Sequence, residues 1–161
     1  MKGGWFLGRQ RPLIGVVHLA ALPGAPRHEG GLDAVIERAT VDAVLLAEAG
    51  VEALIVENYG DAPFWKDDVP PVTVAALTAA ALAVRRAVPA LPLGVNCLRN
   101  DALAAVSIAA AVGAAFVRVN VLTGAMVTDQ GVVEGRAAEV ARLRAAIAPG
   151  LLVAADVLVK H

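Results

Sequence analysis

Ionisable and amide side chains stand at the ends of five apolar runs in this sequence, where they could bind a ligand or transfer a proton. Inside or beside an apolar strand, each of these groups is costly to bury unless it has a partner. Carboxylates and histidines in such positions act as general acids and bases, while arginine, lysine and asparagine orient a substrate. The candidate catalytic residues are Glu57, Asp156, His18 and His161, and the candidate substrate-binding residues are Asn96, Arg118, Asn120 and Lys160.

The period of two in a strand sorts some of these side chains by face. Arg118 and Asn120 share a face, whereas Glu57 and Asn58 point in opposite directions. An arginine within the apolar stretch "FVRVNV" needs a carboxylate nearby, because an uncompensated buried charge costs several kcal/mol. We therefore expect Arg118 to be partly buried and to pair with Glu57 or Asp156.

A single polar residue at a strand end has an ordinary explanation. For His18 alone, a structural hydrogen bond is the more common role of a strand histidine. Five strands that all end in polar groups are harder to explain in this way. We expect a shared ligand site at these strand ends.

Hydrophobic patterning predicts the elements that position these residues. Continuous apolar runs of strand length are typical of parallel strands covered on both faces, and longer amphipathic stretches between them predict helices. The expected strands are Leu13–Leu19, Ala53–Val56, Leu91–Leu98, Phe116–Val121 and Leu151–Val157, and the expected helices are Leu32–Ala49, Val72–Val88, Asp101–Val112 and Gly135–Ala148. This order predicts right-handed βαβ crossovers and a parallel sheet.

Loop lengths indicate which end of the sheet carries function. The links from helices to strands are minimal, whereas long loops follow three strands, at Ala20–Gly31, Asn58–Pro71 and Leu122–Glu134. Ligands bind at the carboxyl ends of parallel strands, where loops vary without disturbing the scaffold. We expect the three loops to lie together with the candidate residues. The first helix is expected to start near Asp33 and to stop at Gly50.

Composition narrows the classes of partner. The 161 residues are 58% hydrophobic and 18% charged, enough for one packed domain over residues 1–161. A net charge of −1 disfavours nucleic acid and anionic membranes, so a small-molecule ligand or a protein is expected as partner. The apolar stretches are too short to span a membrane, which predicts a cytoplasmic protein. The one cysteine, Cys97, is expected to be a buried, unreactive thiol.

Standard cofactor motifs are absent. The sequence has no phosphate-binding loop of the Walker type, no G-x-G-x-x-G after the first strand and no metal-ligand spacing, so no metal is expected and the cofactor is left unknown. Tyr59, Phe64 and Trp65 concentrate in the second long loop. That loop is a lid or an interface, or it packs locally over the strand ends, and the sequence favours neither interpretation.

Five stretches of the sequence resemble one known family. They are "IGVVHLAALPGAP", "EALIVENYGDAPF", "LGVNCLRND", "FVRVNVLTGAMVTDQGVVEG" and "AADVLVKH", and in this order they resemble the BtpA/SgcQ family, named for a photosystem I biogenesis factor. The resemblance implies a TIM-type (β/α)8 barrel of the ribulose-phosphate-binding-like group. It brings no established reaction. Because such barrels need about 250 residues, this chain is expected to hold about the first five βα units of an incomplete barrel, as a fragment.

Alternatives for both fold and function stay open at this point. Five parallel strands also suit an open, doubly wound sheet of the flavodoxin type. One functional hypothesis is a barrel that binds or converts a small polar metabolite, such as a sugar phosphate or a nucleoside-like compound. The second is a non-catalytic assembly or stability factor, and the third is a truncated fragment with neither role. An uncovered edge strand would make such a fragment oligomeric or prone to aggregation.

Overall fold

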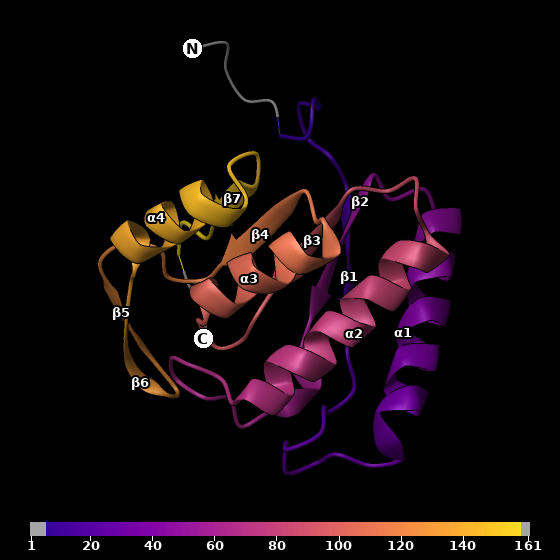
Figure 1. The fold of residues 1–161 in the computed structure, drawn as a ribbon, viewed down its shortest axis with the longest axis horizontal. Coiled ribbons are helices and arrows are strands. Elements are labelled where there is room, and N and C mark those ends of the chain that lie inside the picture. Colours follow the sequence, from indigo (N-terminus) through magenta and orange to yellow (C-terminus); the bar gives the residue numbers. More distant parts are fainter. Residues whose placement is uncertain (1–5, 159–161) are drawn as a thin grey trace.

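A five-stranded parallel sheet with helices packed against it forms the body of the molecule in the computed structural model, which describes residues 6–158 (Figure 1). The sheet strands are β1(Ile14–His18), β2(Ala53–Glu57), β3(Leu93–Asn96), β4(Phe116–Val119) and β7(Leu152–Ala155). The helices are α1(Gly31–Glu48), α2(Pro71–Ala87), α3(Ala102–Val112) and α4(Ala137–Ile147), with a 3-10 turn η1(Tyr59–Asp61). Each expected strand and helix is therefore confirmed, with ends shifted by a few residues.

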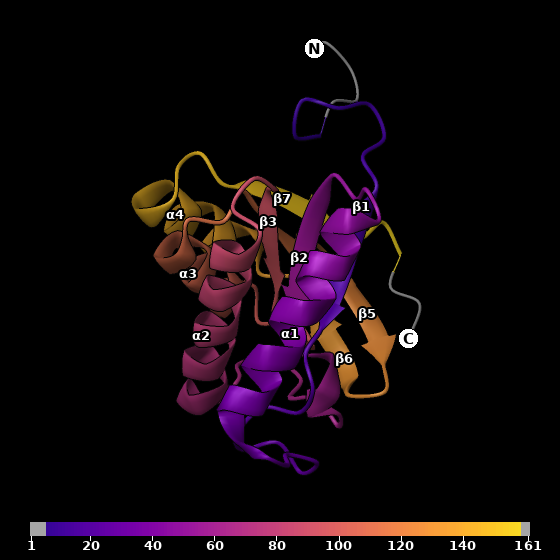
Figure 2. The ribbon, with the colours of Figure 1, turned by 90° about the vertical axis from the view of Figure 1, so that its right-hand side faces the viewer.

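The strands lie in the sheet in the order of the chain, β1-β2-β3-β4-β7, and all are parallel. Consecutive helices contact one another, and the two views show all four on the same side of the sheet (Figures 1 and 2). A doubly wound sheet places helices on both faces and reverses its strand order. The flavodoxin-like alternative is therefore not the arrangement of these residues.

Helix ends follow local sequence signals. Pro71 occupies the first turn of α2, where its missing N–H is not needed. Asp101 caps α3, because its Oδ1 accepts a hydrogen bond from the Ala104 backbone N–H at 2.8 Å. Gly50, with φ 87°, follows α1 as expected. Asp33 does not start α1, since Gly30 is the capping residue and Asp33 stands within the first turn, where its charge favours the helix dipole.

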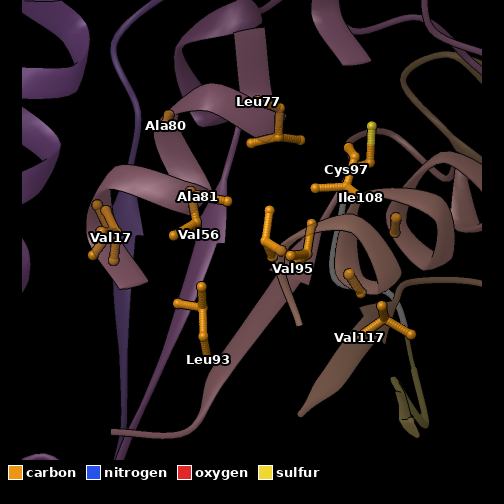
Figure 3. Close-up of a cluster of buried hydrophobic side chains, with 14 of the residues drawn as sticks. Val17, Val56, Leu77, Ala80, Ala81, Leu93, Val95, Cys97, Ile108 and Val117 are labelled. Carbon is orange, nitrogen blue, oxygen red and sulfur yellow. The ribbon is translucent and has the colours of Figure 1, made fainter. Parts of the chain in front are cut away.

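The main hydrophobic core lies between the sheet and the helices (Figure 3). Strand residues that point toward the helices meet small alanine side chains, which let α2 and α3 approach the sheet closely. Buried members of this core include Val17, Val56, Leu77, Ala80, Ala81, Val95, Cys97, Ile108 and Val117. The expected burial of Cys97 is confirmed, with 1% of the residue exposed.

The opposite face of the sheet has a second, smaller apolar cluster near the amino ends of the strands. Ala53, Ile55 and Phe116 form its buried centre. The Phe6 ring packs edge-on against the Phe116 ring, with centroids 5.1 Å apart. Phe116 itself lies over Gly94 of the neighbouring strand, where only a residue without a side chain fits. We call this face, which also carries Glu57 and Arg118, the inner face.

A β-hairpin stands within the third long loop, and its strands were not predicted. Strands β5(Ala125–Thr128) and β6(Gly131–Glu134) pair antiparallel, with Asp129 and Gln130 as the two-residue turn. The hairpin is separate from the main sheet (Figure 2). Its strands are only four residues long, too short for a clear alternation signal in the sequence. Among the helices in the described part of the chain, none is long and apolar enough to cross a membrane.

The close approach of Phe116 to Gly94 gives a stability prediction. A Cβ added by Gly94→Ala overlaps the Phe116 ring and forces the inner-face cluster to repack, so we expect unfolding to require about 1–3 kcal/mol less free energy. Urea denaturation followed by circular dichroism measures this change. Gly150→Ala is the matched control, because its added Cβ meets no atom within 4 Å. Equal midpoints for both variants would contradict the assigned packing.

Candidate functional site

The polar strand ends meet around one cavity at the carboxyl end of the sheet, and of the three long loops the one after β2 lines it. The cavity has a volume of about 450 Å³, within the range of small-ligand sites. Side chains from four of the sheet's strand ends reach it, together with residues of the loops that follow β2 and β3. Its lining consists of His18, Glu57, Tyr59, Phe64, Leu98, Arg99, Arg118, Asn120, Asp156, Val157 and Leu158.

Arg118 links two carboxylates across the inner face. Its Nε and Nη2 donate to the two oxygens of Asp156, both at 3.0 Å, in a bidentate pair. Its Nη1 donates to Glu57 Oε2 at 3.3 Å. The side chain is 34% exposed, so the expectation of a partly buried arginine paired with an acid is confirmed, and both acids take part. These contacts raise the Arg118 pKa, first through the hydrogen bond to Asp156.

Glu57 is the most buried charge of the site. It lies beside His18 on one neighbouring strand and Asn96 on the other in the sheet register. Asn96 Nδ2 donates to Glu57 Oε2 at 2.6 Å, so this oxygen accepts from both Asn96 and Arg118. Only 5% of the Glu57 side chain is exposed. Its role is therefore to hold its neighbours in place more than to touch a ligand directly.

His18 is the ionisable group that the site presents to solvent. Its Nε2 lies 3.3 Å from Glu57 Oε1, and half of its side chain is exposed. The ring stacks on Tyr59, with centroids 4.3 Å apart and planes at 21°. With Nε2 turned to the carboxylate, Nδ1 is the ring nitrogen left for a ligand. A histidine oriented by a buried carboxylate is an arrangement suited to proton transfer.

Asn120 and Asp156 extend this set of contacting polar side chains beyond Arg118. Asn120 Nδ2 donates to Asp156 Oδ2 at 2.9 Å, and Asn120 is 5% exposed. As the strand period requires, Asn120 lines the cavity together with Arg118. The row thus runs from His18 through Glu57, Arg118 and Asp156 to Asn120, over strands β1, β2, β4 and the end of β7.

Another group of buried polar residues has a structural role that sequence reasoning missed. Asn58 Oδ1 accepts from the Leu98 N–H at 2.7 Å, and Asn58 Nδ2 donates to Asp61 Oδ2 at 3.0 Å. Asp61 Oδ1 in turn accepts from the Leu22 N–H at 2.7 Å. These contacts join the loops after β1, β2 and β3. They satisfy loop backbone groups that would otherwise be buried without partners.

Asn100 and Asp101, which follow β3, join this loop to the loops after β4 and β2 in the same way. Asn100 Oδ1 accepts from the Val121 N–H at 2.8 Å, and Asn100 Nδ2 donates to the Val121 carbonyl at 2.9 Å. Asp101 Oδ2 accepts from the Val69 N–H at 2.9 Å. The only sequence signal for these residues is their type, since Asn and Asp favour turns after strands. We refer to Asn58, Asp61, Asn100 and Asp101 as the loop clamps.

The second long loop contains Tyr59, Phe64 and Trp65, and the rings of Phe64 and Trp65 lie in different surroundings. Phe64 lines the cavity, where the Arg99 guanidinium lies 5.9 Å from its ring centroid. Trp65 is 61% exposed, although its carbonyl accepts a hydrogen bond from the Arg99 N–H. Phe64 therefore packs locally over the strand ends. The Trp65 ring remains a surface feature beside a second cavity of about 310 Å³.

The structure brings six of the eight predicted site residues together: His18, Glu57, Asn96, Arg118, Asn120 and Asp156. Lys160 and His161 lie outside the described residues. Within residues 6–158, no group of three or more His, Cys, Asp or Glu side chains is arranged to hold a metal ion.

Similar proteins are found in archaea, a cyanobacterium and an animal. A model of the BtpA family matches residues 9–161. Protein PH1209 of Pyrococcus horikoshii is 55% identical over 94% of this chain and 58% of its own length. The photosystem I biogenesis protein BtpA of Synechocystis is 53% identical over 93% of this chain and 52% of its own. The mitochondrial protein F13E9.13 of Caenorhabditis elegans is 29% identical over 96% and 58%. This chain therefore spans between half and three fifths of these relatives.

The bidentate pair gives a prediction about coupling. In a double-mutant cycle with Arg118→Met and Asp156→Asn, we expect a coupling energy above about 1 kcal/mol, because the pair is half-buried and each partner has fixed geometry. Arg136 and Glu139 form a matched bidentate control and should couple more weakly, because 55% of the Glu139 side chain is exposed against 21% for Asp156. Urea denaturation of the four proteins of each cycle measures both values. A weaker coupling for Arg118 and Asp156 would contradict this account.

Cys97 gives a prediction about pH. Burial raises the pKa of its thiol, and the carboxylates of Asp101 and Asp61 raise it further. The folded chain then keeps this proton at a pH where the unfolded chain, with a thiol pKa near ~8.5, releases it. Stability is therefore lost as pH rises above that value, by about 2 kcal/mol between pH 7 and pH 10. Cys97→Ala should lack this part of the pH dependence in urea denaturation, and identical pH profiles would refute the assignment.

Proposed function

This chain belongs to the BtpA family, and from that premise we propose that the carboxyl end of its sheet binds and converts a small polar metabolite, with His18 as the proton-transfer residue. The observation that carries the proposal is the contact of half-exposed His18 with buried Glu57 at the edge of a cavity. Glu57 orients the imidazole through its contact with Nε2. A proton taken from the ligand by Nδ1 can then leave through the exposed ring to solvent.

The scaffold in this proposal is a TIM-type barrel of the ribulose-phosphate-binding-like group. Consecutive strand order and helices on one side of the sheet are features of such barrels. Five strands over 58% of the length of PH1209 leave room in that relative for about eight such units at the same spacing. Barrel enzymes carry their sites at the carboxyl ends of the strands, which is where the cavity lies.

The ligand in this proposal is a sugar phosphate or a nucleoside-like compound. The cavity combines charged and amide groups on strands with the rings of Tyr59 and Phe64 on one wall. Aromatic rings pack against the flat face of a base or the C–H face of a sugar, while the polar row selects its orientation. Arg118 and Asn120 are the orienting groups, and Asn96 positions Glu57.

Proton transfer can be tested without knowing the complete reaction. We expect the chain in D₂O to introduce deuterium from solvent into one member of a panel of sugar phosphates and nucleosides, as detected by mass spectrometry. His18→Gln should reduce the exchange rate at least about 100-fold, the lower end of general acid–base contributions. His28→Gln is the matched control, because the His28 ring contacts the Ala21 carbonyl through Nδ1 at 2.8 Å and does not line the cavity.

Two results would contradict this proposal. One is a panel in which no compound exchanges deuterium or binds. The other is an exchange rate that is the same in His18→Gln and in the unchanged chain. Circular dichroism of each variant shows that a loss of exchange does not reflect unfolding.

A second candidate function is a non-catalytic assembly role, which the exposed Trp65 ring and the name of the Synechocystis relative, a photosystem I biogenesis protein, favour. Large exposed rings are frequent anchors of protein interfaces. The two functions make opposite demands on the chain. An assembly factor loses its partner with Trp65→Ala and tolerates His18→Gln, whereas the proton-transfer function is lost with His18→Gln and tolerates Trp65→Ala.

A further inference from the structure

The side chain of Asn120 is buried with one of its polar atoms unused. Its Nδ2 donates to Asp156, and a carboxylate oxygen only accepts, so the amide orientation is determined by its partner. Oδ1 is therefore the atom that points away from Asp156. It is buried and has no hydrogen-bond partner among residues 6–158. A buried acceptor without a donor costs free energy, and a ligand that supplies a donor recovers it.

Two other residues of the cavity lining also keep unused hydrogen-bonding capacity. Arg118 uses three of its five N–H groups on Asp156 and Glu57, which leaves two donors. Among the residues that the structure describes, Asp156 Oδ1 accepts from Arg118 Nε alone, so a lone pair of this oxygen is available. A hydroxyl group both donates and accepts, and two adjacent hydroxyls can satisfy both kinds of group. A phosphate or carboxylate oxygen supplies acceptors alone.

The charge of this part of the cavity also discriminates between ligands. Glu57 and Asp156 contribute two negative charges and Arg118 one positive charge, so the three groups sum to −1. Arg118 is thus already neutralised by protein carboxylates. An anionic ligand group placed beside these three residues would meet net repulsion at close range. The Arg99 guanidinium lines another part of the same cavity, next to the Phe64 ring.

We propose that Asn120, Asp156 and Arg118 form a subsite for adjacent hydroxyl groups of a sugar or polyol, and that an anionic group of the same ligand lies elsewhere. This inference rests on the proposed function, because it names the ligand class of the same cavity. A free sugar, a nucleoside and a sugar phosphate share the hydroxyl chemistry. The subsite binds that shared part through a donor to Asn120 Oδ1 and an acceptor for Arg118.

Nuclear magnetic resonance of the ¹⁵N-labelled chain can test the subsite directly. The probes are ribose, adenosine, ribose 5-phosphate and inorganic phosphate, each titrated at pH 7. We expect the side-chain amide signals of Asn120 to shift and saturate with at least one of the three hydroxyl-bearing compounds. Inorganic phosphate alone should neither shift them nor displace that compound. The 2-deoxy analogue of the bound compound should bind at least about tenfold more weakly, as expected when a buried polar group loses its partner.

Variants of the chain provide an independent test of the hydroxyl subsite. Asn120→Leu keeps a similar shape but removes the acceptor together with the hydrogen bond to Asp156, and it should weaken binding at least about tenfold. Gln130→Leu is the matched control, because Gln130 Oε1 is likewise buried without a partner but lies in the hairpin turn outside the cavity lining. If Asn120→Leu does not fold, the 2-deoxy comparison on the unchanged chain still decides the question.

The outcomes separate this inference from the proposed function. Shifts at Tyr59 and Phe64 without shifts at Asn120 would overturn the hydroxyl subsite and leave a ligand site in place. Shifts of Asn120 by inorganic phosphate, or equal affinity for the 2-deoxy analogue, would also overturn it. If no compound shifts any signal of the cavity lining, the small-molecule function fails together with the subsite.

Discussion

The ion pair of Arg118 with Asp156 and Glu57 is the interaction on which the carboxyl end of the sheet depends. A guanidinium on the interior strand β4 must be compensated, and its acids come from β2 on one side and from the end of β7 on the other. Because the fork is bidentate toward Asp156, the outermost strand is held in one register relative to β4. Glu57 is fixed by the same charge, and it then orients His18 and accepts from Asn96. Removing the guanidinium would leave two carboxylates and no cation at the centre of the row.

The loops above this row are held by hydrogen bonds of neutral and acidic side chains in addition to hydrophobic packing. Asn58 and Asn100 each use both ends of an amide to bridge to a neighbouring loop. Asp61 and Asp101 accept from backbone N–H groups at distances below 3.0 Å. Buried backbone groups therefore find partners where the chain is irregular, which is the requirement that helices and strands meet elsewhere. These hydrogen bonds therefore fix the positions of the loops around the cavity.

Sequence reasoning predicted the elements well, because continuous apolar runs and alanine-rich helices give clear periodic signals. It also brought His18, Glu57, Asn96, Arg118, Asn120 and Asp156 to one end of the sheet, since parallel strands share their exits. It could not separate site residues from loop clamps. Asn58 and Asn120 are the same residue type at comparable places, and only the tertiary partner distinguishes them. The hairpin was missed because four-residue strands carry too little alternation to identify, and TIM-barrel closure is a proposal that these five strands leave open.

The edge-on contact of Phe6 with Phe116 has a consequence for the electric field in the cavity. Together with Ile55 and Ala53, these rings form a hydrocarbon layer beneath the polar row on the inner face. These apolar side chains contribute little screening on the side of the ion pairs that they cover. The attraction among Arg118, Glu57 and Asp156 is therefore stronger and less sensitive to salt than that of a fully exposed pair. The smaller apolar cluster near the amino ends of the strands thereby lowers the effective dielectric constant around the charges at the carboxyl ends.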